Sequence, residues 1–390
     1  MHKNLLVCVD NSVESTVAIG LSTKIASTGN SLLTGLHVYA AKLHNDRFSQ
    51  MEATLPAKYR VKEELERQRD IHSSLITKGL EIVSDSYMSV LKTQCEKDNV
   101  AATLKKREGK NYEEILRELE EGGYDLLLMG SIGLGKVERS RVGSVCERVA
   151  RRTIADTLIV KEGGAKGKII VAAIDGSANS FGALRSAISV ASILGLEVEA
   201  ISAFDADYHH VAFKSISTVL SEENGKIFKF KEQEKLHKEI IDENLAALYK
   251  KHLESARLFA EGLGREIKTT LLPGKPFEAI LSYAEKVKPF AIALGKRGVH
   301  ASSTLDIGSA TENVLREAIC SVLISTQLVM PPAQEGTTVK WSIAAIELLE
   351  RIPSFVRGMV KSMIDEEAKK SGVPMVTEEL MKEVRSRYGL

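Results

Sequence analysis

The sequence repeats itself at a fixed interval, and this period constrains the fold more than any other feature. The pattern G-x-x-G-x9-G-[ST] occurs twice, at Gly130, Gly133, Gly143 and Ser144 and at Gly295, Gly298, Gly308 and Ser309. Each copy is preceded by an apolar run that ends in an aspartate, Asp10 or Asp175. The differences 175 − 10, 295 − 130 and 309 − 144 all equal 165. A period of this length indicates a tandem duplication of a whole domain.

Length and composition set the outer limits. A chain of 390 residues with 44% hydrophobic and 27% charged residues suits two globular domains and a remainder. The net charge of +1 gives no electrostatic reason to expect binding to nucleic acid or to an anionic membrane. The four cysteines show no C-x-x-C spacing, and no apolar run is long enough to span a bilayer. We therefore expect a cytoplasmic protein with reduced structural cysteines.

Each repeat alternates short apolar runs with helical patterns, which is typical of parallel strands joined by crossover helices. The expected strands are residues 5–9, 32–38, 101–106, 126–129 and 157–160, then 169–174, 197–203, 267–272, 291–294 and 322–325. The fold class is therefore α/β, with two doubly wound, five-stranded parallel-sheet domains at residues 1–162 and 168–327. Both repeats carry an enlarged, largely helical insertion between the second and third strands, at residues 40–99 and 204–265.

Two details of this plan bear on metal binding and assembly. His209 and His210 lie beside Asp205 and Asp207, but adjacent histidines in a polar loop lack the spacing of metal ligands, so we expect no metal site. The last strands, 157–160 and 322–325, are apolar edges that need covering. The family resemblance described below implies that the two repeats pair through them as a pseudo-dimer, and a homodimer is also possible.

The glycine pattern predicts an anion site. Gly130 follows a strand at the carboxyl edge of a parallel sheet, where doubly wound folds bind ligands. Gly133 lets the backbone approach a ligand closely, and Ser144 is expected at or near the N-cap of a helix with free N–H groups. Asp10 lies at the same edge and could accept hydrogen bonds from a ribose or help to hold a metal ion. The spacing matches neither the Walker A loop nor the G-x-G-x-x-G dinucleotide motif. The alternative is that the glycines only form turns.

These residues give the chain a resemblance to a known family. The aspartate-ended first strand, the segment from Tyr124 to Gly130 and the glycine motif resemble the universal stress protein domain, with its adenine nucleotide alpha hydrolase-like fold. The resemblance implies ATP, with Mg²⁺, as the ligand, and slow hydrolysis at most. It implies these nucleotide-binding residues: Asp10, Val38, Met129, Gly130, Gly133, Gly143, Ser144 and Val145 in repeat one, and Asp175, Ala203, Leu294, Gly295, Gly298, Gly308, Ser309 and Ala310 in repeat two.

Charges near the two motifs differ. Arg141 shortly precedes the helix start in repeat one, whereas repeat two has Asp306 at the aligned position. Lys296 and Arg297, inside the second motif, could compensate. On this basis we expect repeat one to bind ATP more tightly. No residue is identified as catalytic, so a nucleotide-dependent stress-response regulator is expected rather than a fast enzyme.

The remainder, residues 340–390, reads as a small all-α segment. Trp341, the stretch from Ile352 to Arg357 and the stretch from Val376 to Glu379 resemble the C-terminal helical domain of the light-independent protochlorophyllide reductase B subunit. The catalytic body of that reductase has no counterpart here. Two alternatives to nucleotide sensing therefore stay open. One is a nucleotide-independent scaffold whose C-terminal helices bind a protein partner, such as a redox or tetrapyrrole enzyme. The other is a cofactor-handling protein.

Overall fold

The computed structural model describes residues 2–135, 140–162, 166–205, 215–216, 219, 230, 232, 235, 242–299, 305–330, 340–352, 354–371, 373 and 375–388. The chain divides into two compact units, Met1–Pro331 and Pro332–Leu390. His209 and His210 lie outside the described residues. Within the described part, no helix is long and apolar enough to cross a membrane.

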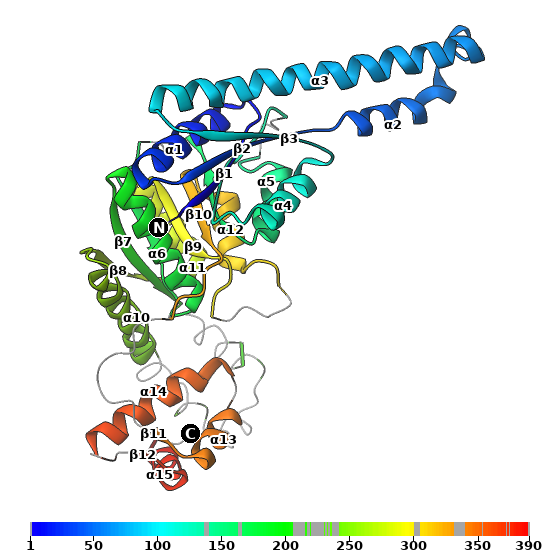
Figure 1. Cartoon of the computed structure of the whole chain (residues 1–390). Helices are drawn as coiled ribbons and strands as arrows, with labels where there is room; N and C mark the ends of the chain where they lie inside the picture. Colours follow the sequence, from blue (N-terminus) through cyan, green and yellow to red (C-terminus); the bar gives the residue numbers. More distant parts are fainter. Residues whose placement is uncertain are drawn as a thin grey trace. The chain divides into compact units, whose positions relative to one another are not determined.

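The elements follow the expected order in both repeats (Figure 1). Repeat one contains β1 (Asn4–Cys8), α1 (Val13–Gly29), β2 (Leu32–Tyr39), α2 (Ala41–Met51), η1 (Glu52–Thr54), η2 (Ala57–Tyr59), α3 (Lys62–Asp98), β3 (Ala102–Glu108), α4 (Asn111–Gly122), β4 (Leu126–Gly130), α5 (Ser144–Arg152) and β5 (Asp156–Val160). Repeat two contains β6 (Ile169–Ala173), α6 (Ala178–Leu194), β7 (Glu197–Phe204), α10 (Asp242–Gly262), β8 (Lys268–Pro273), α11 (Pro276–Val287), β9 (Ala291–Gly295), α12 (Ser309–Glu317) and β10 (Ser321–Ser325).

The two repeats share one sheet of ten strands, in the order β3-β2-β1-β4-β5-β10-β9-β6-β7-β8. All pairs within a repeat are parallel. The junction is the antiparallel pair β5–β10, in which Leu158 lies opposite Leu323. Every residue of β5 and β10 is buried. The expected pairing of the two last strands is therefore confirmed, and it occurs inside one chain.

Helices cover both faces of the sheet. One buried apolar cluster joins the sheet to α1, α3, α6 and α10, and a second joins it to α4, α5, α11 and α12. The outer strand β3 carries Lys105, Lys106 and Arg107, charges that discourage pairing with a further strand. Because the strands of each repeat are parallel, their carboxyl ends lie together at one edge, where ligands bind in such folds.

A ring of ion pairs links the two repeats between α5 and α12. Arg316 lies 2.6 Å from Glu147 and 3.0 Å from Glu312, and Arg151 contacts the same two glutamates. Glu147 and Glu312 are counterparts in the repeat, as are the two arginines, so the ring has approximate two-fold symmetry. The buried Lys161 adds hydrogen bonds of 2.7 and 2.6 Å to the carbonyls of Leu315 and Ala318 at the end of α12.

The insertion of repeat one forms a helical hairpin. Residues of α3 from Ser84 to Cys95 pack against the body, while the first half of α3 extends beyond the sheet with α2 along it (Figure 1). We call residues 41–82 the arm. His72 of α3 stacks on Phe48 of α2 with ring centroids 4.3 Å apart, and Ser73 accepts a 3.2 Å hydrogen bond from Asn45.

The second unit has its own small core. It contains β11 (Lys340–Trp341), α13 (Ile343–Glu350), α14 (Ser354–Lys370), β12 (Met375–Val376) and α15 (Glu378–Tyr388). Ala345, Leu349, Ile364, Val376 and Val384 pack together, and Trp341 Nε1 donates a 2.7 Å hydrogen bond to Asp365. The helices were expected, whereas the short parallel pair β11–β12 was not, and it takes Trp341 out of the first helix.

Candidate functional site

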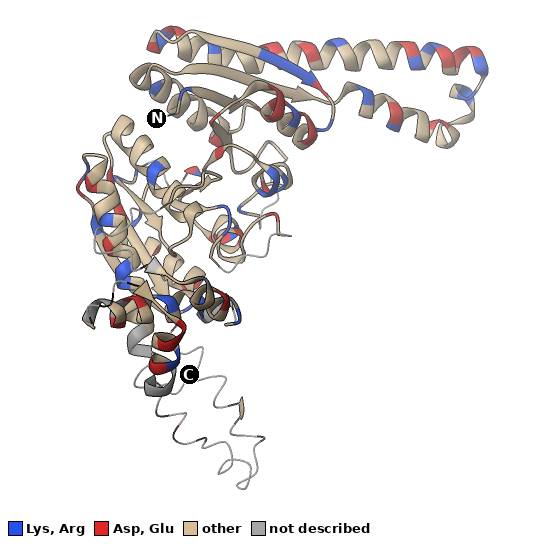
Figure 2. Cartoon of the chain, turned by 60° about the horizontal axis from the view of Figure 1, so that its bottom comes forward, with Lys and Arg blue, Asp and Glu red and all other residues tan. Residues whose placement is uncertain are grey.

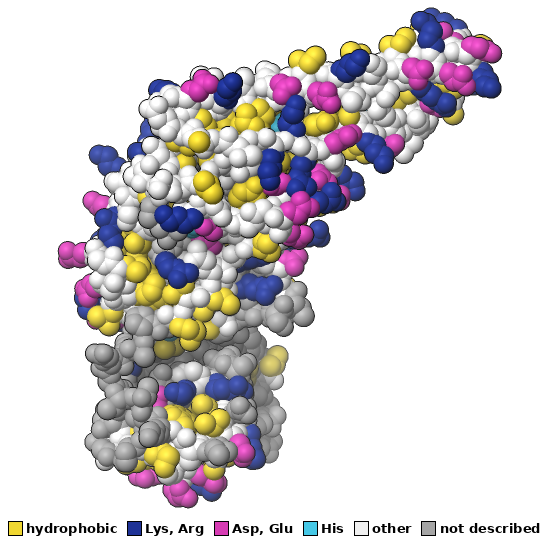
Figure 3. All heavy atoms as spheres, in the orientation of Figure 1, with side chains coloured by type: hydrophobic (Ala, Val, Ile, Leu, Met, Phe, Trp, Pro, Cys, Tyr) yellow, Lys and Arg dark blue, Asp and Glu magenta, His cyan; other side chains and the backbone are white. Residues whose placement is uncertain are grey.

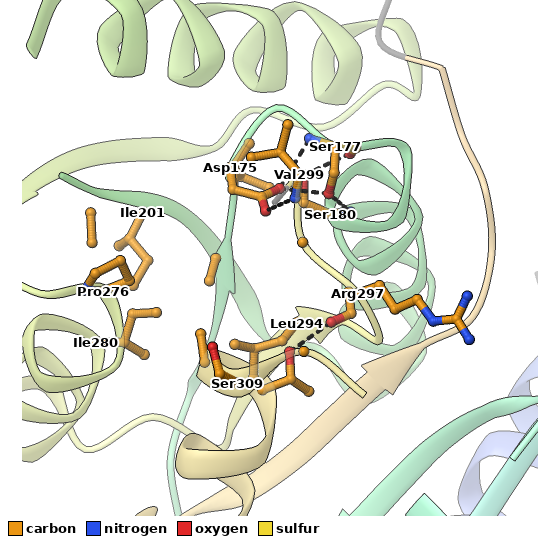
Figure 4. Close-up of a pocket in the computed structure, with 18 of the residues that line it drawn as sticks. Asp175, Ser177, Ser180, Ile201, Pro276, Ile280, Leu294, Arg297, Val299 and Ser309 are labelled. Carbon is orange, nitrogen blue, oxygen red and sulfur yellow. Dashed lines mark hydrogen bonds between the residues drawn. The ribbon is translucent and has the colours of Figure 1, made fainter. Parts of the chain in front are cut away.

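A cavity of about 270 Å³ opens at the carboxyl edge of the sheet in repeat two (Figure 4). Its floor comes from the ends of β6, β7 and β9, and its walls come from α10, α11 and the first turn of α12. Ile201, Pro276 and Ile280 lie together as an apolar recess, and Asp175 and Val299 lie apart from them at a polar rim (Figure 4). Ser309, at the start of α12, lies beside Leu294.

Asp175 organises the polar rim. Its Oδ1 accepts hydrogen bonds from the backbone N–H of Ser177 at 3.0 Å and from the Ser177 hydroxyl at 2.6 Å. Its Oδ2 accepts a 2.9 Å hydrogen bond from the backbone N–H of Val299, directly after Gly298 in the glycine loop. A Cβ on Gly298 would lie 2.6 Å from that Oδ2. The carboxylate therefore fixes the loop against the strand end, and Gly298 is required because the approach is so close.

The N-terminus of α12 faces this rim without a side-chain cap. Gly308 is the N-cap residue, and its N–H donates to the carbonyl of Lys296 at 2.8 Å. By contrast, α6 at the same sheet edge is capped by Ser177, whose Oγ accepts from Ser180 N–H at 3.2 Å. An uncapped helix start presents N–H groups and partial positive charge to an anion. The first turn of α12 is also tied to β9, because Thr311 donates a 2.8 Å hydrogen bond to the carbonyl of Gly295.

The structure brings together every residue predicted for the site of repeat two. These residues line the cavity: Asp175, Ala203, Leu294, Gly295, Gly298, Gly308, Ser309 and Ala310. Gly308 and Gly143 occupy the N-cap positions, and Ser309 and Ser144 are the first helical residues, so Ser144 lies next to the N-cap. Serine hydroxyls therefore do not cap these two helices.

Sequence reasoning missed the aromatic wall. Tyr249 of α10 lines the cavity, and its ring lies 5.5 Å from that of His252. Burial raises the pKa of Tyr249, and the nearby Asp175 raises it further. Burial also lowers the pKa of His252, an effect that Asp175 opposes. Tyr249 belongs to the insertion, outside the motif, so no sequence pattern pointed to it.

At three positions the corresponding place in repeat one has larger side chains. Where repeat two has Ala173, Ala203 and Ala310, repeat one has Cys8, Val38 and Val145, all in or against the apolar cluster. The backbone plan is otherwise the same. Asp10 accepts from the Ser12 N–H and hydroxyl at 3.0 and 2.7 Å, Gly143 N–H donates to the Ser131 carbonyl at 2.7 Å, and a Cβ on Gly133 would lie 2.7 Å from Asp10. The predicted residues Met129 and Gly130 end β4 beside them.

Two of the three cations thought to attract phosphate hydrogen-bond to backbone carbonyls of the other repeat. Arg141 donates to the carbonyl of Glu317 at the end of α12, across the repeat junction. Lys296 donates a 2.8 Å hydrogen bond to the carbonyl of Thr153 at the end of α5. The guanidinium of Arg297 points away from the cavity (Figure 4). The charge comparison that favoured repeat one therefore loses its basis.

The sequence model described as the universal stress protein family matches residues 1–161 and 167–325. The chain belongs to this family. A universal stress protein of Methanocaldococcus jannaschii is 30% identical over 166 residues, which cover 43% of this chain and 86% of that protein. Residues 341–385 match a different model, described as the proto-chlorophyllide reductase 57 kD subunit. Both resemblances noted in the sequence are confirmed.

Solved structures agree on the fold of the tandem. A universal stress protein from Archaeoglobus fulgidus covers 83% of this chain and 97% of its own, with a TM-score of 0.51 and 17% identity. A further universal stress protein, solved in complex with cAMP, covers 41% of this chain and 96% of its own, with a TM-score of 0.27 and 20% identity.

Proposed function

We propose that this tandem universal stress protein binds an adenine nucleotide in repeat two and acts as a nucleotide-responsive regulator. The observation that carries the proposal is the two-part cavity. Its apolar recess suits a purine ring, and its polar end joins a glycine loop to the uncapped start of α12, which suits phosphate groups. The binding of cAMP by a family member agrees with this ligand class.

Repeat two is the better candidate because its side chains are smaller at three positions of the lining. The alanines at 173, 203 and 310 leave room that the cysteine and valines of repeat one fill. We infer that repeat two binds more tightly, the reverse of the order expected from charge. ATP would enter with Mg²⁺ bound mainly by its phosphates, because Asp175 already accepts three hydrogen bonds from the protein.

The described residues that line the cavity suit binding of ATP without rapid hydrolysis. Among the described residues that line the cavity, Asp175 is the one carboxylate, and its oxygens hold the loop. A general base must reach a water near the phosphorus atom, and Asp175 is committed elsewhere. The nucleotide would therefore change the stability of the loop and of α12, and a partner would read that change.

Two matched glycine variants, one in each repeat, test which repeat binds the nucleotide. Gly298→Ala places a methyl group 2.6 Å from Asp175 Oδ2, and Gly133→Ala places one 2.7 Å from Asp10 Oδ2, so the two lesions are matched. In calorimetric titration with MgATP we expect Gly298→Ala to weaken binding by about tenfold or more and Gly133→Ala to leave it unchanged. A wild-type chain that carries no nucleotide when denatured and ignores added MgATP would support the scaffold alternative. A loss confined to Gly133→Ala would move the site to repeat one.

A further inference from the structure

The arm carries an exposed apolar stripe on α3. Ile71, Leu75 and Ile82 are 50%, 67% and 70% exposed, respectively. At 3.6 residues per turn, these three positions lie within about 40° of one another around the helix. Figure 3 shows hydrophobic side chains along the outer edge of the arm. An aligned row of large exposed apolar residues differs from the single scattered ones that are normal on a surface.

The stripe lies away from the helix that α3 already contacts. His72 and Ser73 make the contacts with α2, and their mean direction is about 130° from the stripe. Packing of α2 therefore leaves the stripe free within the described part of the first unit. Met88 and Leu91, through which the same helix packs on the sheet, also point away from the stripe.

The order of residues along the stripe is self-complementary when one copy is reversed. Ile71 and Ile82 lie equally far on either side of the point between Ile76 and Thr77, and so do Leu75 and Lys78. A two-fold axis at this point would set Ile71 against Ile82 of a second copy. It would also set Leu75 against the aliphatic stem of Lys78, which can cover apolar surface while its ammonium group stays in water.

Charged residues beside the stripe are complementary in the same antiparallel alignment of two copies. Arg67 and Asp85 lie on one flank of the stripe, near its opposite ends, with side chains 61% and 67% exposed. A two-fold axis across an antiparallel helix pair keeps a flank on its own side, so Arg67 of each copy meets Asp85 of the other. Their present partners, Glu64 and Lys106, form exposed ion pairs that exchange at little cost. Figure 2 shows basic and acidic residues interspersed along α3.

We propose that the arm is a self-association surface on which α3 pairs antiparallel with α3 of a second copy of this chain. The junction β5–β10, where two separate domains could have paired, is already formed within the chain. The arm therefore gives the molecule a second, independent place to assemble. The pairing covers about three helical turns on each copy, so the dimer is weak and depends on concentration.

Sedimentation velocity of the full chain from ~5 µM to ~0.5 mM tests this, with circular dichroism to verify that each variant is folded. The wild type is expected to dimerise across that range. Leu75→Lys, which sets a new ammonium group against Lys78 of the other copy, should raise the dissociation constant by about a hundredfold. Met51→Lys changes an exposed residue at the end of α2 and serves as the matched control, with no expected effect.

The charge pair tests the register. Arg67→Glu alone and Asp85→Arg alone should each weaken the dimer by about tenfold, because each creates two like-charge contacts. The double variant should restore the wild-type constant. A chain that stays monomeric up to the highest concentration overturns the proposal, as does a dimer indifferent to Leu75→Lys. Failure of the double variant to restore pairing also overturns it.

Discussion

Substitution of Ala203 by valine gives repeat two the side chain that repeat one has at the same place, Val38. Ala203 lines the cavity and is buried at the end of β7. Valine adds two carbon atoms to a space of about 270 Å³ that the bound nucleotide would fill. Overpacking of this kind costs about 1–3 kcal/mol, which corresponds to a loss of about 5- to 150-fold in affinity. The unliganded fold should tolerate the change, because the cavity has room and valine suits a strand.

Thermal and chemical unfolding with and without MgATP measure this loss. At a ligand concentration of 100 times the wild-type dissociation constant, binding stabilises the fold by about 2.7 kcal/mol. A variant that binds a hundredfold more weakly retains only about 0.4 kcal/mol of that effect. The matched control is Val38→Ala in repeat one, which should leave the stabilisation at its wild-type value. Wild-type stabilisation in Ala203→Val, or a loss in Val38→Ala alone, would refute the assignment of the site to repeat two.

Three further predictions concern stability. Burial lowers the pKa of Lys161 to about 8, so the unfolded chain keeps this proton to higher pH and wild-type stability rises between about pH 8 and pH 10.5. Denaturant titrations of wild type and Lys161→Met measure this effect. The difference between their free energies of unfolding should increase by about 2–3 kcal/mol from about pH 8 to about pH 10.5, and a difference that does not change with pH would contradict the argument. Burial alone would raise the pKa of Asp156, but hydrogen bonds from His2 and from the Thr326 N–H hold it below its usual value. Asp156→Asn should therefore lower the free energy of unfolding by about 2–4 kcal/mol at pH 7. The difference from wild type should fade as the pH falls through and below about 3.8, and a difference that persists in acid would contradict the argument. Asp365→Asn weakens the hydrogen bond to Trp341, the single tryptophan, and should lower the stability of the second unit by about 1 kcal/mol when followed by tryptophan fluorescence. An unchanged fluorescence transition would show that this bond contributes nothing.

The architecture could be predicted because several local signals agreed. The fixed interval, the β-branched runs and the helical insertions all specified the same five-strand unit twice, and the structure has that unit. Pairing of β5 with β10 was expected from two apolar edges that need covering and from the family resemblance. The extent of α3 and the existence of the arm did not follow, because an amphipathic pattern specifies a helix without specifying where its contact with the body ends.

The sequence predicted the backbone elements that form the site, but not all of the side chains that line it. Glycine spacing identified the loop and the helix start that meet at the cavity of repeat two, because backbone geometry depends on local sequence. Ala203, Leu294 and Ala310 were expected there only from the family resemblance. Tyr249 comes from a helix far along the chain, and its approach depends on how the insertion packs. The sequence shows that residues 173, 203 and 310 are small. That they border one cavity became clear only from the fold, which brings together two strands and one helix.

Charge does not rank the two repeats, because Arg141 and Lys296 each hydrogen-bond to the other repeat. Arg141 binds the carboxyl end of α12, whose start forms the site of repeat two, and Lys296 binds the carboxyl end of α5, whose start forms the equivalent place in repeat one. Cations are stabilising at such helix ends, so both residues have a structural reason to be present without any ligand.

The glycines of repeat one have a structural reason of the same kind. A Cβ on Gly130 would lie 3.0 Å from the backbone nitrogen of Ser15, and one on Gly133 would lie 2.7 Å from Asp10. The loop must therefore keep these glycines to seat Asp10 and α1, whether or not a nucleotide binds there. The motif in a duplicated chain thus identifies where a site can form. Side-chain size then distinguishes the two copies, and the alanines at 173, 203 and 310 are the reason that we propose repeat two.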